Sequence, residues 1–326
     1  MVFFITFLRA LAACFITNAH YSGVYPIELI ANGGLIGDIL FFAVSGYCLT
    51  KIKFSFPRWY GKRLFRVYPP VIIITFVYTL LGFYPVVLEN AVQWFIYPTH
   101  YHFVASIIVL YIPYFIVLKI RFLKEHIPHI MLIVAILWLA VYALFCDKTT
   151  YNIDNVYSPM IWFLFFEAML FGAYFRTNDA KYRNRFSVLS VVGLVVSFVI
   201  YFASKLLFSK ISSISFLQPI NQIMIFVLLY FFFRVFAGLD ERLERLPKWI
   251  KAVISYIASI TLEIYVVQYV IIDELKYIAG FPLNWFVLTS VILLSATALH
   301  WVCKGFYCLC DGFVKTIALE VRNGKK

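Results

Sequence analysis

Long apolar stretches recur along the whole chain. Ten of them approach the roughly 20 residues that an α-helix needs to cross the hydrocarbon core of a membrane. Hydrophobic residues make up 63% of the chain and charged residues 13%, whereas a soluble domain is about half apolar and a quarter charged. We therefore expect an all-α, polytopic membrane helix bundle, with residues 1–326 forming a single transmembrane domain. The ten predicted spans are 2–19, 33–50, 67–84, 103–118, 128–146, 160–175, 186–204, 219–237, 252–272 and 285–309.

Lysine and arginine are distributed unevenly between the two sets of loops that these spans create. Segments 51–66, 119–124, 176–185 and 234–251 and the tail from 304 hold 23 of the 28 Lys and Arg residues. Because basic loops stay in the cytoplasm, both termini are predicted to be cytoplasmic. The net charge of +12 then reflects topology and contact with anionic membrane lipid. These basic residues are dispersed among loops and form no single patch, so we expect no nucleic-acid partner.

An arginine lies inside the first apolar stretch, and a histidine lies at its end. Arg9 and His20 are eleven positions apart, which on one helix is about three turns plus 20°, with a rise of about 16 Å. Both side chains therefore share a face, about half a membrane apart. An arginine is costly in hydrocarbon, so it faces a protein interior or a water-filled cavity and marks a functional site.

Three carboxylates also fall inside predicted spans: Asp38 in the second, Glu167 in the sixth and Glu263 in the ninth. Asp38 lies between the depths expected for His20 and Arg9, where it orients one of them or neutralises the arginine. An ion pair with one of these three carboxylates is the structural alternative for Arg9. For Glu167 and Glu263 we favour polar pairing within the bundle over catalysis.

The segment 51–66 is the most basic part of the chain. Arg63 and Arg66 are three positions apart, so they lie on one face of a helix. Trp59 and Tyr60 favour an interfacial segment that lies along the membrane and turns into the third span at the proline pair 69–70. Ordinary anchoring by the positive-inside rule is the structural alternative for both arginines.

Small residues in the second span predict close helix packing. Ser45 and Gly46 follow two phenylalanines, and in membranes small residues allow two helices to approach closely. The six cysteines fall in or near apolar spans, without a metal-binding spacing. We expect them to be small buried side chains, and we expect no metal site.

Several motifs together resemble one family. The Arg-x10-His pattern of the first span, Gly-Asp-Ile-Leu-Phe-Phe-Ala-Val-Ser-Gly-Tyr (37–47) and Arg-x-x-Arg-x-Tyr-Pro-Pro (63–70) look like the acyltransferase-3 family of integral-membrane O-acyltransferases. The ninth span, rich in Ser and Tyr, resembles the family as well. The similarity covers the whole chain in length and span count, although its specific motifs lie in the first 70 residues.

The resemblance implies O-acylation, usually acetylation, of a cell-envelope carbohydrate. The acyl group then comes from cytoplasmic acyl-CoA, so acetyl-CoA is the expected co-substrate. The acceptor is a cell-envelope glycan, often on the outer side of the membrane, or a lipid-linked saccharide. A multi-pass protein of a bacterial inner membrane fits this activity.

Roles follow for the residues that match the motifs. His20 is the expected catalytic base for a sugar hydroxyl, or else the carrier of a covalent acyl group. Arg9 is expected to contact the pantetheine arm or a developing oxyanion, with Asp38 as its companion. Arg63 and Arg66 suit the phosphates of CoA. Ser45 is a further donor-binding candidate, because small residues there leave space for the acyl chain.

The chain departs from the family pattern at two places. The family's ninth-span motif commonly ends in His where this chain has Gln268, so no catalytic role is assigned there. His100 matches a histidine motif near the fourth span only in part and is kept as a candidate, while His102 receives no role. The alternative function is a transporter or flippase for a lipid-linked sugar, in which the charged residues line a passage without chemistry.

Overall fold

The computed structural model describes residues 2–156 and 160–323, with side chains described up to residue 310. Helix makes up 80% of the chain, and the described residues contain no strand. The predicted all-α fold is confirmed. The helices are α1 (Phe3–Ala19), α2 (Gly34–Leu49), α3 (Phe56–Leu80), α4 (His102–Lys119), α5 (Arg121–Glu125), α6 (Ile127–Phe145), α7 (Met160–Asn178), α8 (Val188–Lys210), α9 (Gln218–Gly238), α10 (Asp240–Glu244), α11 (Lys248–Ser259), α12 (Thr261–Leu275) and α13 (Leu283–Asn323).

Most of these helices have the length and composition of membrane spans. Among the described residues, eight helices are long and apolar enough to cross a membrane, and nine if the bent pair α11 and α12 forms one span. Helix α1 is apolar and shorter, with 17 residues. Each of the ten predicted spans overlaps one of these helices. The multi-pass arrangement is therefore confirmed, while the number ten stays a prediction.

The predicted ninth span is not one continuous helix. Helices α11 and α12 meet at Ile260 with a bend of 70°. The side chain of Thr261 donates a hydrogen bond to the carbonyl oxygen of Ala258 at 3.0 Å. This bond satisfies one of the carbonyl groups left without a partner where α11 ends. A polar side chain next to the break therefore makes the interruption tolerable inside an apolar span.

Helix α3 continues without a break through the proline pair. Pro69 and Pro70 lie in its interior, so the prediction of a surface segment that turns there is wrong. Proline lacks an N–H group and frees the carbonyl four residues earlier, and membrane helices tolerate this when a neighbour satisfies the freed group. Here the hydroxyl of Tyr307 donates to the carbonyl oxygen of Arg66 at 3.2 Å. The arginines of this segment therefore belong to the membrane-crossing helix itself.

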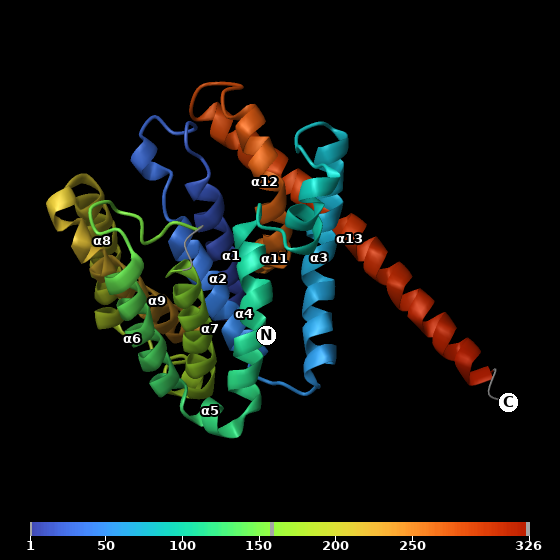
Figure 1. Ribbon diagram of the computed structural model, residues 1–326, viewed down its shortest axis with the longest axis horizontal. Coiled ribbons are helices and arrows are strands. Elements are labelled where there is room, and N and C mark those ends of the chain that lie inside the picture. Colours follow the sequence, from blue (N-terminus) through green and yellow to red (C-terminus); the bar gives the residue numbers. More distant parts are fainter. Residues whose placement is uncertain (1, 157–159, 324–326) are drawn as a thin grey trace.

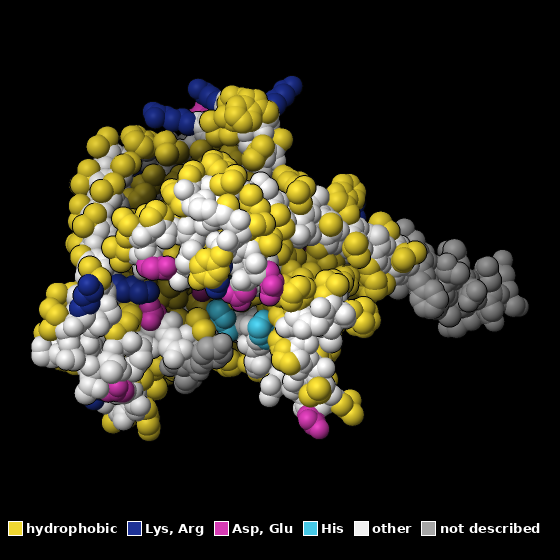
Figure 2. All heavy atoms as spheres, turned by 90° about the horizontal axis from the view of Figure 1, so that it is seen from above, with side chains coloured by type: hydrophobic (Ala, Val, Ile, Leu, Met, Phe, Trp, Pro, Cys, Tyr) yellow, Lys and Arg dark blue, Asp and Glu magenta, His cyan; other side chains and the backbone are white. Residues whose placement is uncertain are grey.

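The loops gather at two ends of the bundle. Figure 1 shows α1 and α2 near the middle, between α6 to α9 on one side and α3 with α11 to α13 on the other. The end where α1 begins also holds residues 50–55, α5, residues 179–181 and α10, and we call it the basic end. The opposite end, with His20, His100 and His102, is the histidine end. Figure 2 looks onto the molecule from above and shows histidine side chains near the middle of that face.

Helices α2 and α7 pack with almost no space between their backbones. A Cβ atom built on Gly46 would lie 2.0 Å from the carbonyl oxygen of Met169 on α7. The carbonyl of Gly46 accepts a hydrogen bond from the hydroxyl of Tyr114 at 2.6 Å. The packing role predicted for Gly46 is confirmed, and this contact fixes the helix that carries Ser45.

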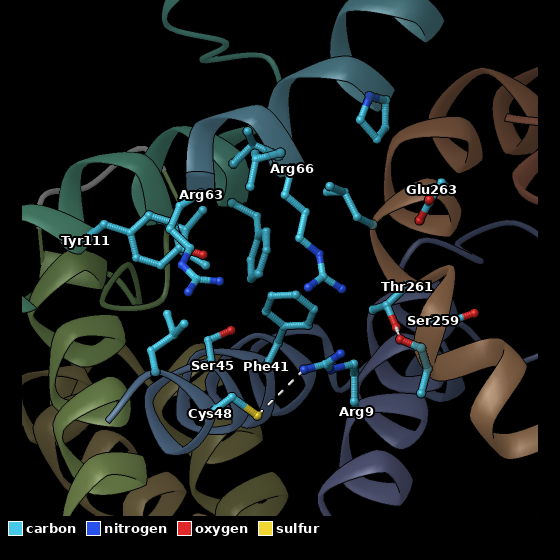
Figure 3. Close-up of a pocket in the computed structure, with 18 of the residues that line it drawn as sticks. Arg9, Phe41, Ser45, Cys48, Arg63, Arg66, Tyr111, Ser259, Thr261 and Glu263 are labelled. Carbon is cyan, nitrogen blue, oxygen red and sulfur yellow. Dashed lines mark hydrogen bonds between the residues drawn. The ribbon is translucent and has the colours of Figure 1, made fainter. Parts of the chain in front are cut away.

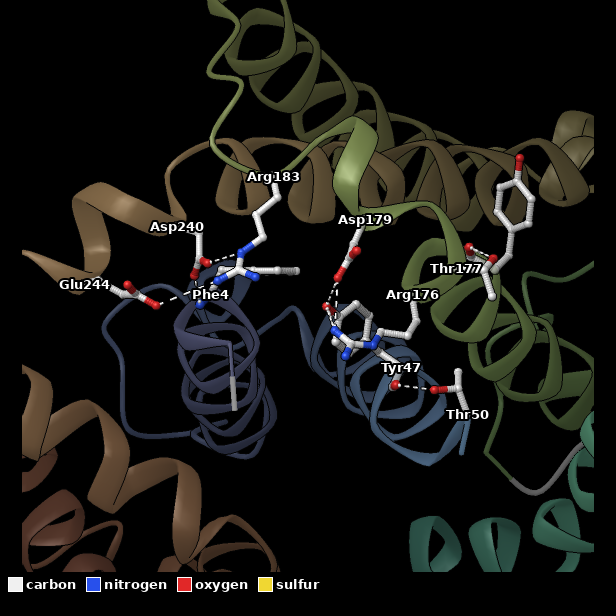
Figure 4. Close-up of polar contacts among 10 residues, drawn as sticks. Phe4, Tyr47, Thr50, Arg176, Thr177, Asp179, Arg183, Asp240 and Glu244 are labelled. Atoms are coloured by element: carbon white, nitrogen blue, oxygen red, sulfur yellow. Dashed lines mark hydrogen bonds and ion pairs between the residues drawn. The ribbon is translucent and has the colours of Figure 1, made fainter. Parts of the chain in front are cut away.

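Polar contacts at the basic end hold the start of α1 and the end of α2 (Figure 4). Asp240 is 1% exposed and accepts hydrogen bonds from the backbone N–H of Phe4 at 2.8 Å and from Nε of Arg183 at 2.6 Å. A carboxylate at the N-terminus of a helix is stabilised by the helix dipole. On α2, the hydroxyl of Tyr47 donates to Asp179 at 2.6 Å. The two helices that carry most predicted site residues are thus fixed at this end.

Candidate active site

A cavity of about 450 Å³ lies among α1, α2, α3, α4 and α11 to α13, and we call it the arginine cavity. Figure 3 shows the side chains of Arg9, Arg63 and Arg66 pointing into it. Ser45 lines the same cavity from α2. The structure therefore brings together both predicted donor-binding arginines, Ser45 and one of the three predicted catalytic residues. The cavity lies toward the basic end, because it includes the last turn of α2.

The arginine cavity carries an excess of positive charge. Arg66 lies close enough to both Arg9 and Arg63 for the like charges to interact. Among the described residues, Glu263 is the one carboxylate that lines the cavity. Like charges held near one another in a partly buried space attract an anion more strongly than they do in water. Guanidinium groups also match phosphate oxygens in two-pronged hydrogen bonds.

Aromatic packing sets the direction of Arg63. Its guanidinium carbon lies 5.6 Å from the centroid of the Trp59 ring, and that ring contacts Tyr111 edge-on at 5.7 Å. Trp59 is 2% exposed, so it forms a fixed support. Nε of Arg63 is buried and has no hydrogen-bond partner among the described residues. The aromatic support therefore holds the Arg63 side chain in the direction that Figure 3 shows, into the cavity.

Arg9 makes no ion pair with a carboxylate in the described part of the chain. Its Nη2 atom lies 3.8 Å from Sγ of Cys48, which is the hydrogen-bond partner shown in Figure 3. The alternative of an ion pair with Asp38, Glu167 or Glu263 is therefore wrong. Sulfur is a weak acceptor, so the guanidinium group of Arg9 keeps most of its hydrogen-bonding capacity for another partner.

An apolar wall faces the arginines. Phe41 of α2 and Phe103 of α4 line the cavity, and their ring centroids are 4.8 Å apart. The hydroxyl of Ser45 makes no hydrogen bond to another described residue. The cavity therefore combines cationic groups with an apolar surface and one small uncommitted hydroxyl, a combination that suits an anionic ligand with an apolar arm.

Glu263 pairs with a histidine that the sequence did not single out. Nδ1 of His300 lies 2.9 Å from Oε1 of Glu263, and both residues line the arginine cavity. The polar pairing predicted for Glu263 is confirmed. Within the described residues, no group of three or more His, Cys, Asp or Glu side chains is arranged to hold a metal ion.

Glu167 does not have the polar partner that was predicted for it. Its Oε1 atom is buried without a hydrogen bond among the described residues, and so is Nε2 of Gln222. Both side chains line a cavity of about 70 Å³ between α6, α7 and α9. The prediction that Glu167 pairs directly with a polar side chain is therefore wrong.

Asp38 is buried in α2, with 6% of its surface exposed. It does not line the arginine cavity, and it makes no hydrogen bond or ion pair to another residue within the described ranges. It lies instead within electrostatic range of Tyr201 and Tyr265. The prediction that Asp38 neutralises or orients Arg9 is wrong, because Asp38 does not line the cavity that holds Arg9. The alternative, a direct contact that orients His20, is not found within the described ranges either.

His20 lies just past the end of α1, outside the arginine cavity. Its ring centroid is 4.9 Å from that of Tyr269, and eleven helical positions place it about 16 Å along the helix from Arg9. Burial lowers the pKa of His20, while the charge of Asp273 opposes this effect. The imidazole is therefore neutral near pH 7 and able to accept a proton.

Two further histidines lie near His20. His102 is near enough to His20 that their protonated forms would repel each other, and its ring centroid is 6.3 Å from that of Tyr265. The ring centroid of His100 lies 5.6 Å from that of Tyr269, the residue that also contacts His20. The motif comparison left His102 without a role. Its position becomes visible only when the start of α4 is placed beside α12.

These features define a membrane protein of many helices with a cationic, partly apolar cavity. The chain belongs to the acyltransferase-3 family, whose model, described as an acyltransferase domain, matches residues 2–304. It is therefore a multi-pass membrane acyltransferase. A comparison with curated proteins and one with solved structures found no match.

Proposed function

We propose that this acyltransferase moves an acyl group from acyl-CoA to a hydroxyl of a cell-envelope glycan or lipid-linked saccharide. Acetyl is the first candidate for the acyl group. The observation that carries the proposal is the convergence of Arg9, Arg63 and Arg66 in one cavity. The nucleotide end of CoA is rich in phosphate, and guanidinium groups bind phosphate in paired hydrogen bonds. The pantetheine arm then lies along the apolar wall of Phe41 and Phe103.

The separation of Arg9 and His20 divides their roles. A rise of about 16 Å is too long for both side chains to meet the same thioester carbonyl. Arg9 therefore contacts the phosphates or the pantetheine amides of the donor. His20 acts where the acyl group is transferred. This choice excludes the oxyanion role for Arg9 that the family resemblance left open.

The transfer step needs a base at the acceptor hydroxyl. The hydroxyl oxygen attacks the thioester carbonyl carbon, a C–O bond forms and the C–S bond breaks. His20 takes the hydroxyl proton, and CoA leaves as a thiolate that is then protonated. In the covalent route, a ring nitrogen of His20 attacks the thioester first and the hydroxyl then displaces it.

The orientation of the bundle completes the proposal. By the positive-inside rule the basic end faces the cytoplasm, where acyl-CoA is found. The histidine end then faces outward, toward the acceptor. A bacterial inner membrane provides both substrates on the required sides.

Calorimetry of acetyl-CoA binding to the purified protein in nanodiscs tests this function without knowledge of the acceptor. Arg63→Ala and Arg66→Ala are each expected to weaken binding about tenfold or more, since hydrogen bonds to charged groups are worth about 1.5–3 kcal/mol. Arg58→Ala is the matched control, because Arg58 lies on the same helix and packs over Phe54 outside the cavity. His20→Ala should leave donor binding unchanged.

Two outcomes would reject the proposal. One is that neither acetyl-CoA nor longer acyl-CoAs bind to a folded preparation. The other is that Arg58→Ala weakens binding as much as the two cavity variants do. Either result removes the donor site, and transport of a lipid-linked sugar then becomes the function to test.

A further inference from the structure

A second cavity, of about 200 Å³, lies at the histidine end, where α4 and α7 begin. Its polar lining comes from the segment before α4, from α4 itself and from α7. The residues that supply it are Tyr97, Thr99, His102, Ser106 and Trp162, and we call this space the outer cavity. It shares no lining residue with the arginine cavity.

The polar groups of the outer cavity are left uncommitted by the described residues. None of its five polar side chains makes a hydrogen bond to another residue in the described part of the chain. Ser106 is 1% exposed, and a buried hydroxyl without a partner costs free energy. Five uncommitted groups that converge on one small space are therefore placed for a ligand.

The lining of the outer cavity defines the chemistry of that ligand. No Lys, Arg, Asp or Glu residue in the described part of the chain lines it, so it offers no charge for an anion such as CoA. Tyr97 and Trp162 supply aromatic rings, and the face of such a ring has a negative potential that attracts the weakly positive C–H groups of a saturated ring. The hydroxyls of Thr99 and Ser106 and the ring of His102 supply donors and acceptors. This combination of aromatic rings with hydrogen-bonding groups, without charge, matches one uncharged sugar ring.

Helix α4 connects the outer cavity to the reaction proposed above. His102 and Ser106 face the outer cavity, whereas Phe103 and Val104 line the arginine cavity. His102 is also near enough to His20 that their protonated forms would repel each other. A ligand in the outer cavity therefore lies near the end of the molecule where His20 acts.

We propose that the outer cavity binds a single neutral sugar residue of the acceptor, with one of its hydroxyls beside His102. Its assignment to the acceptor rests on the proposed acyltransferase function. The binding of a neutral sugar does not depend on that function. The two can therefore be tested separately on the same preparation.

Tryptophan fluorescence in nanodiscs tests the proposal. The probes are the methyl glycosides of glucose, galactose, rhamnose and N-acetylglucosamine, with methyl glucuronide as the anionic comparison. At least one neutral glycoside should change the fluorescence of the wild type and of Trp285→Phe, but not that of Trp162→Phe. Trp285 is the matched control, because it lies at the histidine end and lines a different cavity.

A second variant guards against loss of folding. Thr99 is exposed, so Thr99→Val should fold and should weaken glycoside binding about threefold to tenfold, the value of one hydrogen bond. The proposal is overturned if no neutral glycoside produces a fluorescence change that depends on Trp162, or if methyl glucuronide alone produces one. It is also overturned if Thr99→Val binds the glycoside like the wild type. Acetyl-CoA calorimetry on the same nanodiscs reports separately on the proposed function.

Discussion

Gly172 of α7 faces α2 so closely that a Cβ atom on it would lie 1.9 Å from the carbonyl oxygen of Ala43. No real side chain is tolerated at that distance, so the two helices can meet only through glycine. The contact holds α2 in place, and α2 carries Ser45 and Cys48 into the arginine cavity. A substitution at Gly172 therefore acts on the fold and on the cavity together.

Gly172→Ala is expected to destabilise the protein by about 1–3 kcal/mol, the usual cost of forcing an extra carbon into a packed interface. Thermal unfolding in a mild detergent measures the change. Gly61→Ala is the matched control, because Gly61 is also helical and a Cβ atom there meets nothing within 4 Å. An alanine at Gly61 should leave stability equal or raise it by up to about 1 kcal/mol. Equal melting temperatures for the two variants would contradict the packing argument.

Asp240→Asn should lower stability by about 1–3 kcal/mol, because the buried carboxylate accepts hydrogen bonds from Phe4 and Arg183. The amide keeps the shape and one acceptor oxygen, but it loses the negative charge that the Arg183 guanidinium and the N-terminus of α1 favour. Glu244→Gln is the control, since the Glu244 carboxylate is about half exposed and lies 3.9 Å from Arg183. Its removal should change stability by less than about 0.5 kcal/mol. A similar loss in both variants would contradict the special weight assigned to the buried carboxylate of Asp240.

Arg9→Met should weaken acetyl-CoA binding about tenfold, because it removes a charged donor from the cavity while keeping the apolar length of the side chain. Cys48→Ala removes the partner of Arg9. It should change affinity less than about twofold, since a thiol is a weak acceptor. Calorimetry on the two variants decides between a ligand-binding arginine and a structural one. Loss of affinity in Cys48→Ala alone would favour the structural role.

The acid limb of the pH–rate profile should have a midpoint below about pH 6.5, the ordinary pKa of histidine. Burial lowers the pKa of His20, and a base works only in its neutral form, so activity persists into mildly acidic solution. The charge of Asp273 raises the pKa of His20. Asp273→Asn should therefore move the limb to still lower pH.

Glu274→Gln is the matched control for this measurement. Glu274 is the next exposed acid on α12, and the pKa of His20 responds to Asp273 rather than to it. Initial rates of CoA release, measured from pH 5 upward in buffers of constant ionic strength, give the profile. A limb above pH 6.5, or one that shifts equally in both variants, would exclude His20 as the titrating base.

The sequence was sufficient for the fold class and for part of the arginine cavity. Long apolar stretches leave few alternatives to a helix bundle, and the spacing of Arg63 and Arg66 requires that both lie on one helical face. Arg9 and Ser45 lie on different helices, so helical periodicity, which acts within one helix, could not place them together. Only the resemblance to the family motifs indicated that they share a site.

Contacts between distant helices could not be predicted. Glu263 and His300 are 37 positions apart, and no local pattern connects them. The break at Ile260 was missed because hydropathy averages over a window longer than one turn. His102 was set aside for lack of a motif, although its position beside α12 and the outer cavity gives it a role to test.

The break at Ile260 also places the beginning of a helix inside the bundle. Thr261 and Glu263, in the first turn of α12, line the arginine cavity. The first N–H groups of a helix have no partner within it and carry about half a positive charge. Part of the attraction for anions is therefore supplied by the backbone. A variant that lacks one arginine will therefore keep part of the positive potential of the cavity, because the other two arginines and the N-terminus of α12 remain.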